Sequence, residues 1–512
     1  MVYNVISLLE GGDRLKRKLA DRAGEIYLCL MGSLFLLAVP FPGDAGGYSS
    51  ITAPKFLLFA SLSVPLLVCT LPALPTLRRG FRRAFCPEPG QLCALLYLLW
   101  TLLSTLCSPW AGQAVTGASR REGLVTQALY VLSFLALSVF SRPGKLQLLS
   151  FAGGVTLLDL VCILQLCGHN PLGLYPAGMS WQDANIRYPG SYLGTLGNAG
   201  LTGALLCTAC ALLLLCLLQK CRGRLPLLLP LLLSAWVLGR SGVSAGRLAL
   251  MLLMLLALPA AVKTLAAFCR ALLLYPPVLA ALFLPTLSRG AVLALIGLMA
   301  LGLLLRRLPR QERDLRRPMY LLTAALALGA LIFLWGYDGW RQSLKEASAL
   351  LHGQVQDSFG SGRVYIWRQC LQAFPQRPLL GSGPDTLALR GLSPYVWYSA
   401  ETGKSVTSPI DAAHSEYLQV LVCQGVPAAV GRAGLALISL LRFFRRGDRA
   451  SGICAGAALC YSIQACFGIS MCQSAPAFWL LLACSENLRC SENLRCSESL
   501  HDREMRDLPR KI

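Results

Sequence analysis

Residues 199–218 read AGLTGALLCTACALLLLCLL, twenty consecutive residues without a charged side chain. A helix needs about 20 mainly apolar residues to cross the roughly 30 Å hydrocarbon core of a membrane. Similar runs recur along the whole chain of 512 residues. The sequence therefore predicts an all-α, polytopic helical integral membrane protein with about 12–14 transmembrane segments. The expected segments are 26–42, 51–74, 91–107, 123–140, 147–167, 199–218, 225–239, 246–262, 270–286, 289–305, 319–336, 412–441, 452–469 and 472–484.

The composition agrees with a membrane protein and argues against a soluble enzyme. Hydrophobic residues make up 55% of the chain and charged residues 14%, whereas ordinary soluble domains carry about 25% charged residues. The formal net charge is +22, but the basic residues form short clusters between the apolar runs and not one patch. This distribution is typical of the positive-inside rule and does not favour nucleic-acid binding.

The basic clusters also predict an orientation. Most of the 47 Lys and Arg residues fall in alternate connecting segments, which places both termini in the cytoplasm. The expected parts are a basic N-terminus (1–25), a transmembrane bundle (26–336), a large extracytoplasmic loop (337–411), C-terminal transmembrane helices (412–484) and a low-complexity cytoplasmic tail (485–512). Within the large loop, residues 363–374 are expected to form a short amphipathic helix at the membrane interface.

Cysteine patterns predict no metal site. Most of the 21 cysteines lie inside apolar segments, without the spacing of a disulfide framework or of a zinc site. Carboxylates are too scattered to form a magnesium cage. We expect no cofactor and no metal ion.

Arginines at the outer ends of apolar segments are the first candidate site residues. Arg247 and Arg289 occupy such positions, where an unpaired guanidinium is costly and often marks function. Arg121 belongs to a further outer cluster with Arg120 and Glu122. Arginine donates a planar fork of N–H groups that suits phosphate oxygens. The alternative for these arginines is a structural role, in which the side chain reaches the interface or solvent.

The large loop and its exit supply the remaining candidates. Arg363 and Trp367 are four residues apart and share one helical face. His414 and Tyr417 lie where this loop becomes a membrane segment. A histidine at such a border can act as a general base near neutral pH, although it can also be a merely interfacial polar residue.

These motifs together resemble the O-antigen ligase and polysaccharide polymerase superfamily of bacterial envelope proteins. The resemblance runs from about residue 90 to residue 484, through short motifs in a shared order. They are Gly117-Ala-Ser-Arg-Arg-Glu-Gly, Gly194-Thr-Leu-Gly-Asn, Leu287-Ser-Arg-Gly-Ala, Ser361-Gly-Arg with Trp367, Pro378-Leu-Leu-Gly-Ser-Gly-Pro, and Ala413-His-Ser-Glu-Tyr-Leu-Gln.

The resemblance implies a glycosyltransferase of the bacterial cytoplasmic membrane. Such an enzyme moves a glycan from an undecaprenyl-diphosphate carrier to an acceptor hydroxyl on a glycan, lipid or protein, with inversion and without a metal ion. By matching motif position, Arg289 and Arg363 would hold the donor diphosphate and His414 would remove the acceptor proton. Arg121 would be an auxiliary substrate contact, and Arg247 belongs to a second hairpin that resembles the one carrying Arg289.

A transporter or flippase for an anionic or lipid-linked envelope precursor is the alternative function. Outer arginines and many membrane segments suit both classes, and the likeness of hairpins 225–262 and 270–305 hints at an internal repeat. A general base beside an anion site on one face favours the enzyme.

Overall fold

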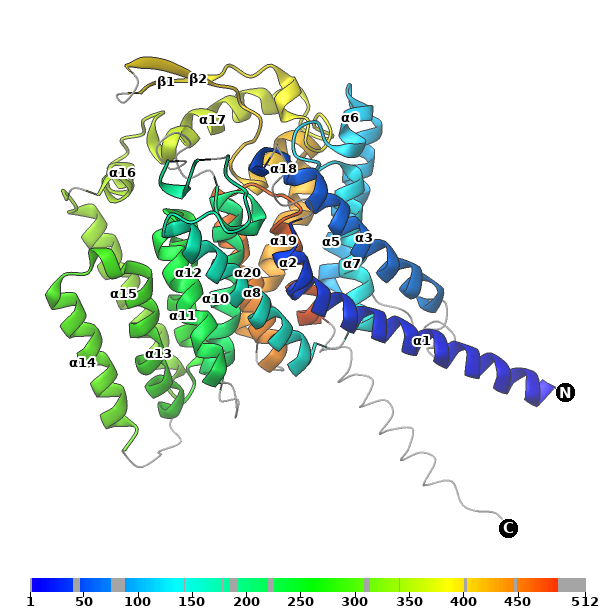
Figure 1. The fold of residues 1–512 in the computed structure, drawn as a ribbon, viewed down its shortest axis with the longest axis horizontal. Coiled ribbons are helices and arrows are strands. Elements are labelled where there is room, and N and C mark those ends of the chain that lie inside the picture. The colour runs from blue at the N-terminus through cyan, green and yellow to red at the C-terminus, as the bar shows by residue number, and fades with distance from the viewer. Residues whose placement is uncertain are drawn as a thin grey trace, which may run out of the picture.

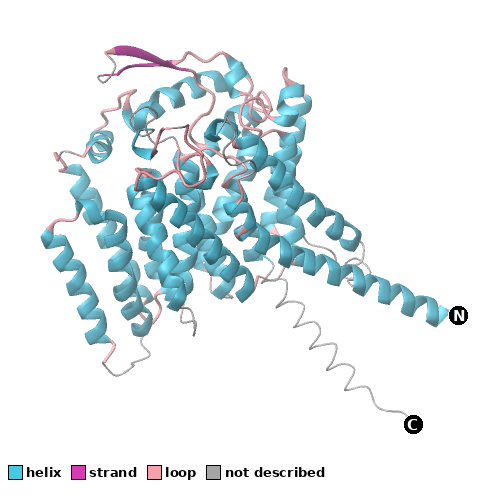
Figure 2. Ribbon diagram, viewed as in Figure 1, coloured by secondary structure: helices cyan, strands magenta, loops and turns pink. Residues whose placement is uncertain are grey.

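A computed structural model describes residues 2–39, 47–74, 88–141, 143–176, 178–183, 192–219, 225–307, 314–339, 341–399, 403–445 and 449–486. Nearly all of its regular structure is helical (Figure 2). Among the described residues, nine helices are long and apolar enough to cross a membrane, and four shorter apolar helices accompany them. The prediction of an all-α polytopic membrane protein is confirmed.

The helices follow the predicted segments closely in most of the bundle. The N-terminal half contains α1 (Val2–Gly32), α2 (Leu34–Leu37), α3 (Thr52–Thr70), α5 (Pro89–Leu106), α6 (Ala111–Thr116), α7 (Leu124–Phe140), α8 (Lys145–Leu166) and α10 (Ala199–Leu218). The next part contains α11 (Leu228–Arg240), α12 (Ser244–Ala261), α13 (Leu265–Phe283), α14 (Arg289–Leu305) and α15 (Arg316–Trp335). After the outer loop come α18 (Glu416–Gln424), α19 (Val426–Phe444), α20 (Arg449–Gln464) and a last helix, Ala475–Glu486.

The uncharged segment 199–218 forms the centre of the bundle. Of the 20 residues in α10, 18 are buried, and the helix packs against α8, α11, α12, α13 and α20. Asn198 caps its N-terminus by accepting a hydrogen bond from the Gly200 backbone N–H. A helix that is apolar on every side is stable only when other helices or lipid surround it.

Two predicted segments differ from the structure. The segment 26–42 is the end of a helix that begins at Val2 and stops at Gly32, before the short α2. The segment 412–441 is divided into α18 and α19 at Gly425, whose φ of +87° ends the first helix. A side chain at Gly425 would collide with the backbone of Leu379. The break therefore lets the turn 378–384 pack against the two helices.

The predicted outer loop covers one end of the bundle (Figure 1, top). It contains α16 (Gln342–Leu351) and α17 (Phe359–Ala373), so a helix over the predicted range 363–374 is confirmed. It also contains an antiparallel hairpin that the sequence did not predict, β1 (Tyr395–Ser399) and β2 (Lys404–Ser408), with Tyr395 opposite Ser408. Most of the predicted tail 485–512 lies outside the described residues.

Candidate functional site

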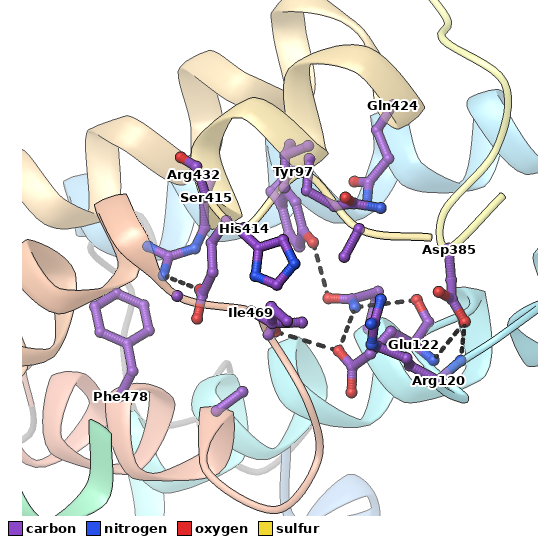
Figure 3. Close-up of a pocket in the computed structure, with 18 of the residues that line it drawn as sticks. Tyr97, Arg120, Glu122, Asp385, His414, Ser415, Gln424, Arg432, Ile469 and Phe478 are labelled. Carbon is purple, nitrogen blue, oxygen red and sulfur yellow. Dashed lines mark hydrogen bonds and ion pairs between the residues drawn. The ribbon is translucent and has the colours of Figure 1, made fainter. Parts of the chain in front are cut away.

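A polar pocket lies beneath the outer loop, where α5, α7, α18, α19 and the last helix meet (Figure 3). About 630 Å³ of its volume is free of atoms, including the part open to solvent. His414 points into its middle, between Arg432 and Phe478 on one side and Arg120, Glu122 and Asp385 on the other. The pocket therefore joins residues from distant parts of the chain around one imidazole.

Three contacts hold His414 in place. Its backbone has a φ of +49°, which is uncommon outside glycine and needs support from the surrounding structure. The indole Nε1 of Trp367 donates to the carbonyl of the preceding residue, Ala413, at 2.9 Å. The Ala413 N–H donates to the side chain of Gln419, and Ser415 caps α18. The loop that carries His414 is thus fixed to both α17 and α18.

His414 is an unprotonated base at neutral pH. Burial, together with the positive charges of Arg363 and Arg120, lowers its pKa from 6.5 to about 4, while Asp411 opposes the shift. A neutral imidazole can accept a proton from a hydroxyl group. No carboxylate among the described residues is hydrogen-bonded to this imidazole, so His414 has the protonation state that a general base requires.

Arg363 lies close enough to His414 for its charge to lower the pKa of the imidazole, and one of its own hydrogen-bond donors has no partner in the described structure. Gly360, Ser361 and Gly362 all have positive φ and turn the chain sharply just before it. The Nη1 group of Arg363 donates to the Gly360 carbonyl at 2.6 Å, but its buried Nε has no hydrogen-bond partner in the described structure. Burial also lowers the pKa of Arg363. A buried donor without a partner is rare in proteins, and an anion would satisfy it.

The loop from Gly117 to Gly123 is folded around the carboxylate of Asp385. This carboxylate accepts hydrogen bonds from the backbone N–H groups of Ser119 and Arg120 and from the Ser119 hydroxyl, at 2.8 to 3.1 Å. Arg120 in turn forms an ion pair with Asp411 at 2.7 Å, three residues before His414. Asp385 thus determines the position of Arg120 against the His414 loop.

Glu122 forms the floor of the pocket. The side chain is buried and accepts hydrogen bonds from Tyr130, Gln127 and Ser470. Burial raises its pKa from 4.5 to about 8, and the nearby charges of Asp385 and Glu416 act in the same direction. Glu122 is therefore protonated at neutral pH and adds no charge to the site.

A buried ion pair closes the opposite side. Arg432 lies 2.9 Å from Glu416, and both side chains are about 95% buried. Tyr461 donates a second hydrogen bond to Glu416 at 2.7 Å. The Arg432 guanidinium also lies over the rings of Phe478 and Tyr417, at 4.3 and 5.1 Å from their centroids. This pairing explains how an arginine is accommodated within an apolar helix.

The structure brings some of the predicted site residues together and leaves others apart. Trp367 donates a hydrogen bond to the residue before His414, and the charge of Arg363 acts on His414, although Arg363 does not itself line the pocket. Tyr417 lies under Arg432, and its hydroxyl donates to the Ser462 carbonyl, so it supports the pocket wall. Arg121 is exposed, and its neighbour Arg120 lines the pocket.

Arg247 and Arg289 lie outside this pocket. Arg247, near the start of α12, donates to the Ser244 hydroxyl at 3.2 Å. Arg289 is exposed at the start of α14, which packs on α13 at one edge of the bundle (Figure 1). Their roles in binding a substrate stay predictions.

Four residues of the pocket are not among the predicted site residues. Glu122 and Arg120 are visible in the sequence only as neighbours of Arg121, and Asp385 is one of several scattered carboxylates. Arg432 carried the clearest signal, because an arginine inside an apolar segment requires a buried partner. Only the fold shows that Asp385 reaches the 117–123 loop.

The described residues around His414 form no metal site. Within the described ranges, no three His, Cys, Asp or Glu side chains are arranged in a way that could hold a metal ion. The polar groups that face His414 are guanidinium, carboxyl, hydroxyl and amide groups.

Comparison with known proteins supports the resemblance seen in the motifs. Residues 271–432 match the sequence model of the protein family described as O-antigen ligase. The matched segment contains Arg289, Arg363, Asp385, His414 and the Glu416–Arg432 pair. No curated protein matches the chain. The chain therefore has the helices of a multi-pass membrane protein, and its segment 271–432 is similar to the O-antigen ligase family of bacterial envelope proteins.

Proposed function

We propose that this protein transfers a glycan from an undecaprenyl-diphosphate carrier to an acceptor hydroxyl at the outer face of the cytoplasmic membrane. The family match supports a membrane glycan-transfer enzyme with a lipid-linked donor and an acceptor. The proposed orientation has both termini in the cytoplasm, so that the His414 pocket faces outward. The acceptor is a glycan, a lipid or a protein.

The proposed reaction is a direct displacement at the anomeric carbon. His414 removes the proton of the acceptor hydroxyl while its oxygen bonds to that carbon. The bond from carbon to the diphosphate oxygen breaks on the opposite side, which inverts the configuration. The proton remains on His414 until product release, and undecaprenyl diphosphate leaves with the bonding electrons. This scheme requires no metal ion and no cofactor.

The observation that carries this proposal is a guanidinium with an unpaired N–H donor, whose positive charge acts on an unprotonated imidazole. Arg363 has a buried donor without a partner, and its charge contributes to the low pKa of His414. Negative charge grows on the leaving diphosphate as the glycosidic bond breaks. Hydrogen-bond donors that are already in position in a partly dry site stabilise the transition state, in which this charge develops, more than they stabilise the ground state.

Arg363 can be tested against an arginine on the same helix. We expect Arg363→Ala to lower the rate of undecaprenyl diphosphate release by about 10²–10³, the range for removal of a single oxyanion donor. Arg363→Lys keeps the positive charge but loses the planar fork of N–H donors, so its rate should lie between those of Arg363→Ala and the wild type. Arg368→Ala is the matched control, because Arg368 is half-exposed and pairs with Asp357. The assay uses purified protein, an undecaprenyl-diphosphate glycan and acceptor in the presence of EDTA.

The same assay decides two further points. A requirement for added metal, or equal losses in Arg363→Ala and Arg368→Ala, would contradict the proposal. Arg289→Ala belongs in the series because the family resemblance implies a donor contact there. A large loss in Arg289→Ala would mean that the diphosphate approaches from the α14 edge of the bundle.

Glu122 should set the alkaline limit of activity. Because its pKa is raised to about 8, it is neutral at pH 7 and becomes an anion above pH 8. The pocket would then hold another negative charge beside Asp385 and Glu416 and would bind the diphosphate less well. We expect kcat/KM to fall above pH 8 in the wild type and to stay level in Glu122→Gln, measured from pH 6 to pH 10. An unchanged alkaline limb in that variant would exclude Glu122 as its cause.

A further inference from the structure

A second, much larger cavity lies in the same bundle, away from His414. It is bounded by α1, α2, α8, α10, α20 and the last helix, Ala475–Glu486, and holds about 2010 Å³ of atom-free space, including its open mouth. Its walls are mainly apolar, with residues such as Phe35, Leu212 and Leu480. No residue that lines it also lines the His414 pocket.

The depth of the cavity can be read along α10. Leu205, Leu212, Cys216 and Gln219 all line it. These residues span 14 helical steps, which corresponds to about 21 Å at 1.5 Å per residue. The hydrocarbon core of a bilayer is about 30 Å thick, so the cavity extends through more than one leaflet. An apolar space of this depth within a membrane suits a hydrocarbon chain and not water.

The mouth of the cavity is cationic. Lys145 begins α8 and Arg449 begins α20, and both line the cavity at an exposed end, which we call its mouth. Both residues are exposed, and neither forms an ion pair with a described residue. Basic residues at the mouth of an apolar site between membrane helices are typical of binding sites for anionic lipid headgroups.

The mouth lies at the opposite end of the bundle from His414. Helix α7 begins two residues after Glu122, which lines the His414 pocket, and ends five residues before Lys145; its 17 residues span about 26 Å. Helix α20 begins at Arg449 and ends at Gln464, four residues before the segment 468–470, which again lines the His414 pocket. A diphosphate bound at this mouth would therefore be too far from His414 to react. The occupant is not the glycan donor.

One helix separates the two sites. In the last helix, Phe478 and Trp479 line the His414 pocket, whereas Ala477, Leu480 and Leu481 line the cavity. Phe478 also contacts Arg432. An occupant of the cavity would support the helix that forms one wall of the His414 pocket.

We propose that this cavity binds an anionic glycerophospholipid. One acyl chain lies along α10 between α8, α20 and the last helix, and the phosphate lies between Lys145 and Arg449. The lipid fills the space that the protein leaves open and stabilises the last helix. This proposal is independent of the reaction proposed for His414.

The test compares an anionic with a zwitterionic lipid, and the wild type with a variant that lacks the two basic residues at the mouth. Delipidated protein in detergent is incubated with phosphatidylglycerol or with phosphatidylcholine, and bound lipid is counted by native mass spectrometry. Each basic residue near a membrane surface contributes about 1 kcal/mol to binding of anionic lipid. The double variant Lys145→Gln with Arg449→Gln should therefore bind phosphatidylglycerol about 30-fold more weakly. The control is Arg306→Gln with Arg307→Gln, two exposed arginines in the turn after α14 that do not line the cavity.

A second variant tests the acyl chain itself. Leu212→Phe with Cys216→Phe places two rings in the cavity and should abolish retention of phosphatidylglycerol. Phosphatidylglycerol should raise the thermal midpoint of the wild type but not of this variant, and each protein's midpoint without lipid shows that it is folded. Equal binding of the two lipids, or unchanged binding in both double variants, would overturn the proposal.

Discussion

Replacement of His414 by alanine should lower the rate of glycan transfer by about 10²–10⁴, the usual contribution of a positioned general base. The structure gives a reason for a large effect. No other histidine lines the pocket, and the carboxyl of Glu122 is protonated at neutral pH, so within the described structure it cannot replace the imidazole as a base.

The acid limb of the pH profile gives this prediction a second readout. Because the pKa of His414 is lowered to about 4, the free enzyme keeps its base unprotonated down to about pH 5. We expect kcat/KM to fall only below that pH, and not near 6.5 as for an ordinary histidine. Binding of the anionic donor should raise the pKa of His414, so the acid limb of kcat should lie at a higher pH than that of kcat/KM.

His352 supplies the matched control. Its ring lies against Trp335, tilted by 37° with 4.2 Å between ring centroids, and its Nδ1 lies 2.9 Å from the Ser348 carbonyl, outside the pocket. His352→Ala removes the same side chain from the same outer loop and should retain activity. Full turnover by His414→Ala, with insertion and thermal stability like those of the wild type, would contradict the proposed mechanism.

The sequence predicted most of the fold because apolar length is a local property. A run such as 199–218 has few alternatives to a membrane helix, and the structure contains that helix with the same bounds. The break at Gly425 was missed because it depends on a distant contact with the backbone of Leu379. Likewise, the β1–β2 hairpin lies in a polar loop, where hydropathy carries little information.

The candidate site was predictable only in part, for a similar reason. His414, Arg363 and Trp367 lie within 51 positions of one another, in motifs that can be seen in the sequence. The contribution of Arg120 depends on Asp385, which is 265 residues away in the chain. Similarly, Glu122 gains its high pKa from burial, against the hydrogen bonds that it accepts from Tyr130 and Ser470, and no spacing predicts this environment.

The buried pair of Glu416 and Arg432 should dominate the stability of the C-terminal helices. Removing one partner leaves the other charge buried and uncompensated, which typically costs about 3–5 kcal/mol. We therefore expect Glu416→Ala to lower the thermal midpoint far more than most single substitutions do. Arg432 already has one buried nitrogen without a hydrogen-bond partner in the described structure, so loss of Glu416 would leave it held mainly by the rings of Tyr417 and Phe478.

A double-variant cycle separates charge from packing in this pair. Suppose that Glu416→Ala loses stability because the charge of Arg432 stays buried without a partner. Then the double variant Glu416→Leu with Arg432→Met should be much more stable than either single variant, because an apolar pair of similar volume needs no compensating charge. The exposed pair of Arg368 and Asp357 is the control, for which Arg368→Ala should cost no more than about 1 kcal/mol. Additive losses in the cycle would mean that the two side chains contribute by packing alone. Recovery of stability without recovery of activity would instead show that the pair is kept for the geometry of the pocket around His414.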